Sequence, residues 1–99
     1  MITVRTCEKE GYDVCYVLQD GEQTSCGGIV GGELVCDDVC TQKELMLRAL
    51  INKCRNDFIK NVTTREIWGV DLARFGFRQE GAYWKADWSD LKLPHECEK

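Results

Sequence analysis

The segment from Glu33 to Asp57, ELVCDDVCTQKELMLRALINKCRND, most constrains what this chain can fold into. Its first part has the apolar character of a buried strand, and its second part has the periodicity of an amphipathic helix. Apolar side chains recur there at three- and four-residue spacing, which gives the helix one apolar face: Leu47, Leu50, Ile51, Cys54 and Phe58. Thr41 to Glu44 match a capping box, so the Thr41 hydroxyl is expected to cap the helix. The segment predicts a strand leading into a helix whose N-terminus can meet an anion.

Four strands are expected before this helix, in an antiparallel meander. β-branched and aromatic residues alternate with turn residues, and the dipeptides Asp20-Gly21 and Gly31-Gly32 are typical of tight hairpin turns. The strands are predicted over residues 2–8, 12–19, 24–30 and 33–39. Gly27-Gly28, inside the third strand, indicates a bulge or a close approach of another segment to the backbone.

The second half of the chain predicts a strand, a helix and a further extended region. Residues 59–64 favour a strand, 65–75 a short helix that ends at Gly76, and 82–88 an aromatic final strand. The expected fold class is therefore α+β, or mixed α/β: an antiparallel meander followed by helix–strand–helix–strand, with helices packed on a sheet. The length of 99 residues fits a single domain over residues 1–99.

Charge and cysteine content narrow the classes of function. A net charge of −4 argues against binding to nucleic acid or to an anionic membrane surface. No apolar run approaches the ~20 residues of a membrane span, and the start MITVRTCEKE has no signal-peptide core, so a cytoplasmic protein is expected. The seven cysteines are an odd number and are expected to be reduced thiols.

The order of elements, together with LARFGFRQEG at residues 72–81, resembles the C-terminal half of the GNAT N-acetyltransferase superfamily. In that family a helix ends in a Gly-Phe pair, here Gly76-Phe77, before a return strand. CGGIVGGELVCDDV, residues 26–39, looks like the central hairpin of the family, and residues 41–57 look like its cofactor-side helix. The resemblance covers most of the chain after Tyr12. It implies acetyl-CoA as cofactor and a small-molecule or peptide amine as acceptor.

The resemblance also implies positions for the cofactor and the catalytic base. The backbone of the fourth strand would hold the pantetheine arm, and the start of the helix would face the pyrophosphate: Leu34, Val35, Cys36, Thr41, Gln42 and Lys43. The end of the fourth strand would face the acyl-transfer cleft, where Asp37 or Asp38 can act as general base toward the amine. The alternative for both carboxylates is a solvated strand end.

Three departures from the family pattern point to a reduced member. No glycine lies between Val39 and Leu45, so the backbone cannot easily wrap a diphosphate. Leu72 stands where many members have a tyrosine that protonates the departing thiolate, and the segment between the first two strands is nearly absent. Two hypotheses follow. The first is a small acetyl-CoA-dependent N-acetyltransferase. The second is a non-catalytic module that uses a sheet edge or the aromatic last strand to bind a partner or to self-associate, for example as a homodimer.

A zinc site is a third and weaker hypothesis. Cys36 and Cys40, with His95 and Cys97 near the end of the sequence, have the right side chains for zinc but lack the paired spacing typical of such sites. Two core thiols explain Cys36 and Cys40 equally well, because positions four apart on a strand share a face. No metal is predicted.

Overall fold

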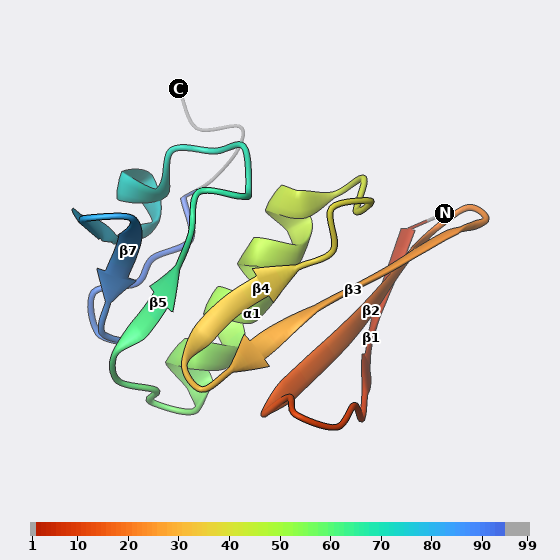
Figure 1. Ribbon diagram of the computed structural model, residues 1–99, viewed down its shortest axis with the longest axis horizontal. Coiled ribbons are helices and arrows are strands. Elements are labelled where there is room, and N and C mark those ends of the chain that lie inside the picture. Colours follow the sequence, from red (N-terminus) through yellow and green to blue (C-terminus); the bar gives the residue numbers. More distant parts are fainter. Residues whose placement is uncertain (1, 95–99) are drawn as a thin grey trace.

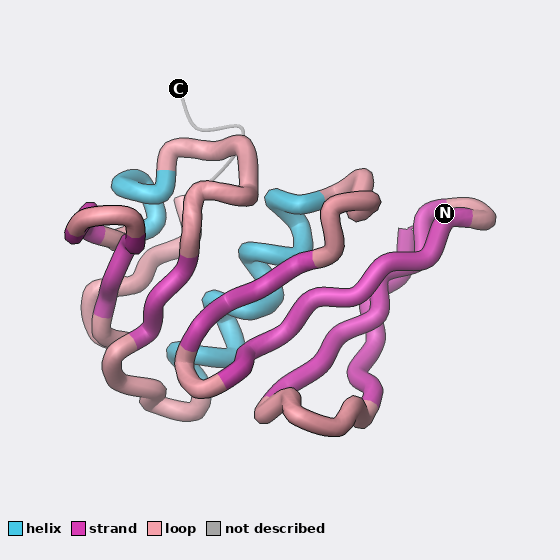
Figure 2. The backbone as a smooth tube through the Cα atoms, in the orientation of Figure 1, coloured by secondary structure: helices cyan, strands magenta, loops and turns pink. Residues whose placement is uncertain are grey.

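The computed structural model describes residues 2–94. Within that range the chain forms one seven-stranded sheet and one α-helix (Figure 1). The elements are, in chain order, β1 (Ile2–Cys7), β2 (Val14–Asp20), β3 (Gln23–Val30), β4 (Glu33–Cys36), α1 (Lys43–Asn56), β5 (Val62–Thr64), the 3₁₀ turn η1 (Leu72–Phe75), β6 (Arg78–Glu80) and β7 (Tyr83–Ala86). Figure 2 shows that strands and loops make up most of the chain.

The strand order in the sheet is β1-β2-β3-β4-β5-β7-β6. The predicted antiparallel meander of the first four strands is confirmed, with Gly21 and the Gly31-Gly32 pair at positive φ in the two tight turns. β4 and β5 are parallel, and α1 provides the connection between them. The two C-terminal pairs, β5 with β7 and β7 with β6, are antiparallel.

The expected GNAT-like layer of several helices packed on a sheet is wrong. The described residues form mostly sheet with a single α-helix, and the predicted helix over 65–75 is reduced to the one turn η1. Two local features explain this. Gly69 has φ +72°, which no right-handed helix allows, and the Asp71 carboxylate accepts from the Ala73 N–H, so that a helical turn starts only there. Gly76, in the left-handed conformation, ends the turn as the sequence predicted.

Helix α1 buries the predicted apolar face against the sheet. Leu47, Leu50, Ile51 and Cys54 are fully buried, whereas Phe58 follows the helix and is 63% exposed. The Phe58 ring instead packs edge-on against Trp88, with 4.8 Å between ring centroids. Since the helix ends at Asn56, the 3.6-residue pattern no longer places position 58 on the buried face.

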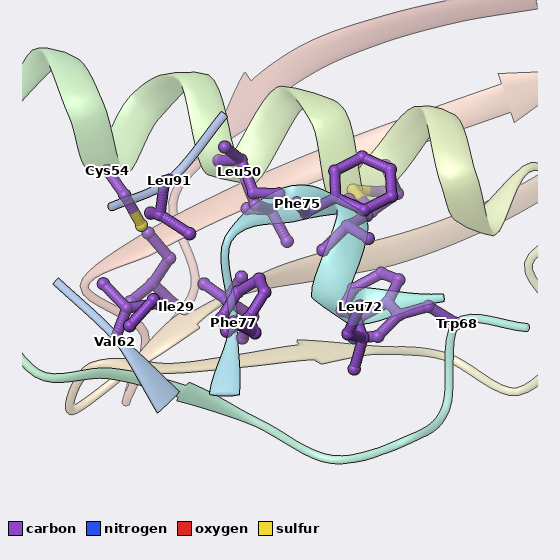
Figure 3. Close-up of a cluster of buried hydrophobic side chains, with 14 of the residues drawn as sticks. Ile29, Leu50, Cys54, Val62, Trp68, Leu72, Phe75, Phe77 and Leu91 are labelled. Atoms are coloured by element: carbon purple, nitrogen blue, oxygen red, sulfur yellow. The ribbon is translucent and has the colours of Figure 1, made fainter. Parts of the chain in front are cut away.

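The core lies between α1 and one face of the sheet, and η1 closes its end (Figure 3). We call this face of the sheet the inner face. Alternation along the strands and the register place Leu18, Ile29 and Leu34 on it, all at most 1% exposed. Gly27 is also on the inner face, and a Cβ there would come within 2.8 Å of the Met46 side chain. The close approach predicted for the glycine pair is therefore confirmed, and it lets α1 lie near β3.

The opposite, outer face of the sheet is not covered by the helix (Figure 1). Cys15, Cys26 and Val35 lie there by the same alternation. The Tyr12 ring covers Gly28, where a Cβ would come within 2.6 Å of the ring carbon Cδ2. None of the helices among residues 2–94 has the length and apolar character required to span a membrane.

Candidate functional site

The candidate site is the place where β4 and β5 stop pairing. The two strands pair at only two positions, Glu33 with Thr63 and Leu34 with Thr64. β4 then continues to Cys36, whereas β5 ends at Thr64. Figure 1 shows the two segments diverging from this point, toward the end of the sheet where α1 begins. We call this end of the pairing, between residues 35–36 of β4 and residues 65–68, the β4–β5 opening.

The backbone of β4 directs alternate peptide groups toward this opening. The Gly32 carbonyl accepts from the Thr63 N–H at 2.9 Å, and the Leu34 carbonyl accepts from the Thr64 hydroxyl at 2.9 Å. Because peptide groups alternate sides along a strand, Cys36 is the next residue whose N–H and C=O point toward the β5 side, as the carbonyls of Gly32 and Leu34 do. β5 has ended at that level, so Cys36 presents a strand edge to the opening.

A buried polar chain lies where the pairing of β4 with β5 stops. The Trp68 indole N–H donates to the Thr64 hydroxyl at 2.8 Å, and that hydroxyl donates to the Leu34 carbonyl. Thr64 is fully buried and Trp68 is 2% exposed. Three residues of β4 were predicted to bind the pantetheine arm. The Leu34 carbonyl already accepts from Thr64, and the N–H and C=O of Val35 point toward β3. Of the three, only Cys36 directs its N–H and C=O into the opening.

The start of α1 differs from the predicted capping box. The N-cap is Gln42, whose side chain makes no capping hydrogen bond. The Thr41 hydroxyl instead donates to the Asp20 carboxylate at 2.7 Å, a contact with the β2–β3 turn that local sequence does not encode. The first-turn backbone N–H groups are therefore left for solvent or a ligand. The capping-box prediction is wrong, while Gln42 and Lys43 do lie at the helix start.

The charges near that helix start partly favour an anion. Lys43 is the first helical residue, and its ammonium adds to the positive end of the helix dipole. Glu44 follows it, but the Glu44 carboxylate accepts two hydrogen bonds from Arg48, at 3.1 and 3.2 Å. Because this ion pair offsets the Glu44 charge, the acidic residue repels an anion less than the sequence suggests.

The two candidate bases have different roles in the structure. The Asp37 carboxylate accepts from the Cys26 N–H at 2.8 Å, while the Asp37 N–H donates to the Cys26 carbonyl at 2.9 Å. These bonds tie Asp37 to β3 and end β4 at Cys36, three residues earlier than predicted. Asp38 is exposed in the following turn, between β4 and α1. Asp38 is thus the carboxylate better placed to accept a proton from a ligand.

The Cys36 thiol is protonated at neutral pH. Burial, followed by the neighbouring Cys40 thiol, raises the pKa of Cys36 to about 12, so Cys36 is a poor nucleophile. Among residues 2–94, no three Cys, His, Asp or Glu side chains gather as a set that could hold a metal ion. His95 and Cys97, the other two side chains of the zinc hypothesis, lie outside the described residues.

Sequence reasoning did not single out Thr64 and Trp68, which shape the opening. The signal was present as a Thr-Arg-Glu-Ile-Trp segment, with hydroxyl and indole four residues apart directly after a strand. A buried tryptophan needs an acceptor for its N–H, and a nearby hydroxyl is a common partner.

A scan against family models, a search of curated proteins and a search of solved structures each find no match for this chain.

Proposed function

We propose that this protein binds an acyl-CoA thioester, with acetyl-CoA as the expected ligand, in the β4–β5 opening. The observation that supports this is the length of β4, which extends past β5 and directs the Cys36 peptide into the opening. The pantetheine arm is an extended chain with two amide groups, so it can add to a strand edge as a peptide does. Such pairing uses main-chain groups and does not require particular side chains.

The helix start supplies the second part of the proposed site. α1 begins at the end of the sheet toward which β4 and β5 diverge (Figure 1), and Lys43 is its first residue. Lys43 and the first-turn N–H groups can attract the pyrophosphate of the ligand, although without glycines the backbone contacts it over a smaller area. We therefore propose weaker binding than a glycine-rich phosphate loop would give.

Acyl transfer to an amine is the activity proposed for this site. Acetyl-CoA supplies the acetyl group as a thioester, which an amine can attack directly. Asp38, exposed in the turn between β4 and α1, accepts the amine proton directly or through one water. Leu72 has no ionisable proton, so solvent must protonate the departing thiolate. The acceptor proposed is a small-molecule or peptide amine, and the proposed location is the cytoplasm, where acetyl-CoA and the free thiols of this chain coexist.

A calorimetric titration with acetyl-CoA tests the binding. The wild-type chain is expected to release heat on titration, and Lys43→Glu should weaken binding about tenfold because it reverses the charge at the helix start. Lys60→Glu is the matched control, since Lys60 is an exposed lysine in the loop between α1 and β5. Absence of heat at millimolar ligand, or equal losses in the two variants, would contradict the proposed site.

Self-association through β1 is a second candidate function, favoured by the free edge of the sheet. Within residues 2–94, β1 pairs only with β2. It runs for six residues without proline and carries the 41%-exposed side chain of Ile2. Such an edge can pair with the same strand of a second copy about a two-fold axis. Ile2→Lys should then abolish a dimer in sedimentation equilibrium, whereas Leu45→Lys, at a 39%-exposed position of α1, should not. A monomeric wild-type chain at every concentration would exclude this candidate.

A further inference from the structure

Two thiols outside the proposed acyl-CoA site face each other across β1 and β2. Cys7, the last residue of β1, lies directly opposite Cys15 in the antiparallel register. The Cys7 thiol donates to the Cys15 sulfur, with 2.9 Å between the two Sγ atoms. Directly opposed residues have Cα atoms about 4.5–5.5 Å apart, which is inside the range that a disulfide bridges without backbone movement.

A hollow of about 480 Å³ is lined by both cysteines. It is formed by Cys7, Cys15 and the connection between the two strands, residues 8–13, and Glu8, Glu10 and Asp13 contribute three carboxylates to its lining. The single ammonium is that of Lys9, which lies over the Tyr12 ring at 5.1 Å from the ring centroid. The lining is thus predominantly acidic, which favours a cationic ligand.

Exposure sets the order in which the two thiols can react. Cys7 is half-buried, whereas Cys15 is only 3% exposed. Burial, followed by the hydrogen bond and the charge of Cys7, raises the pKa of Cys15 to about 12. Cys7 is therefore the thiol that a small reagent reaches first. Modification of Cys7 removes two of the causes that raise the pKa of Cys15, the hydrogen bond and the charge of Cys7, while burial remains.

We propose that Cys7 and Cys15 form a dithiol site that exchanges with small cationic disulfides and closes into a cross-strand disulfide. The Cys7 thiolate attacks one sulfur of the ligand disulfide, forming a mixed disulfide and releasing one ligand thiolate. Cys15 then loses its proton to solvent and attacks the Cys7 sulfur, releasing the second ligand thiolate. The two protein thiols are oxidised and the ligand disulfide is reduced to two thiols, so atoms and electrons balance.

The product would tie the edge strand to the rest of the sheet. Among the described strands β1 pairs with β2 alone, and the bridge would close the short connection between them covalently. We expect the oxidised chain to melt about 5–10 °C higher than the reduced chain, because the bridge restricts the unfolded state.

Exchange with cystamine, a small dicationic disulfide, tests the proposal. After incubation with cystamine, the wild-type chain should lose roughly 2 Da, and peptide mapping should recover a Cys7–Cys15 link. Cys15→Ser should stop at a cysteamine adduct on Cys7, and Cys7→Ser should react at least about tenfold more slowly. Cys26→Ser, on the outer face of neighbouring β3, is the matched control and should exchange as the wild type does.

Oxidised glutathione, which carries net negative charge, separates the acidic hollow from simple thiol exposure. It should react more slowly than cystamine, and the difference should shrink at high salt. A persistent cysteamine adduct in the wild type, a link mapped to other cysteines, or equal rates for Cys7→Ser and wild type would overturn the proposal. The wild-type mapping needs no variant, so a variant that fails to fold leaves the test intact.

Discussion

The two faces of the sheet are stabilised in different ways. The inner face packs large aliphatic side chains against α1, and Leu34, Leu47 and Leu50 are fully buried there. Among the described residues, the outer face has no helix above it and carries smaller residues, including Cys26, Gly28 and Val35. One helix can cover only one face, so the stability of this chain should depend mainly on the inner face.

The largest effect should come from truncating an inner-face contact. Leu50→Ala should lower the free energy of unfolding by about 2–5 kcal/mol, because Leu50 is fully buried between α1 and the sheet. Val35→Ala, at a half-buried outer-face position, should cost about 1 kcal/mol. Urea unfolding of both variants measures the difference. Equal losses would show that the two faces contribute alike.

The second-largest effect should come from alkaline pH, which should lower the free energy of unfolding through Cys54 of α1, buried against the inner face. Burial, followed by the Asp57 carboxylate, raises the pKa of Cys54 from 9.0 to about 11. Since the folded-state pKa is the higher one, the stabilisation is complete below about pH 9 and is lost as pH rises to about 11. Cys54 should account for roughly 2–3 kcal/mol of that loss.

Unfolding by urea at a series of pH values measures this dependence. Cys54→Ala should make the decline between pH 9 and 11 shallower, because the buried thiol no longer ionises on unfolding. An unchanged slope in that variant would assign the alkaline loss to other groups.

The polar chain beside the β4–β5 opening should have an intermediate effect. Thr64→Val leaves the Trp68 indole N–H and the Leu34 carbonyl without the hydroxyl between them, which should cost about 1–3 kcal/mol. Trp68→Phe removes only the indole N–H that donates to the Thr64 hydroxyl. A double-mutant cycle between the two positions should give a coupling of about 0.5 kcal/mol or more, and additive losses would show that the hydrogen bond contributes little.

The smallest effect should come from an exposed ion pair at the sheet end. Lys85 and Glu80 lie 3.3 Å apart on β7 and β6, with both side chains about half exposed. Glu80→Gln should change the free energy of unfolding by less than about 0.5 kcal/mol. A loss above 1 kcal/mol would show that this end of the sheet is more tightly held than its exposure suggests.

Local sequence patterns predicted those elements whose causes are local. The β1–β4 meander followed from turn dipeptides such as Gly31-Gly32, and the buried face of α1 followed from apolar spacing. The missed features depend on distant partners. The Thr41 hydroxyl bonds to Asp20, and the Asp37 carboxylate bonds to Cys26, so the helix start and the end of β4 both shift.

The candidate site was predicted only in part for the same reason. The family resemblance points to Cys36, Gln42 and Lys43. The structure places Cys36 at a strand edge and the other two residues at the helix start. The opening itself exists because β5 stops two positions along β4, which is a property of sheet register and not of any motif. The Cys7–Cys15 pair likewise depends on the register between β1 and β2.

Amide hydrogen exchange with and without acetyl-CoA tests the central claim most directly, because it reports on single backbone groups. If the pantetheine arm pairs with β4, acetyl-CoA should slow exchange of the Cys36 N–H at least about tenfold. The amides of β1, at the far edge of the sheet, should be unaffected. Unchanged exchange at Cys36 under saturating acetyl-CoA would contradict the claim, and protection confined to β1 at rising protein concentration would favour self-association instead.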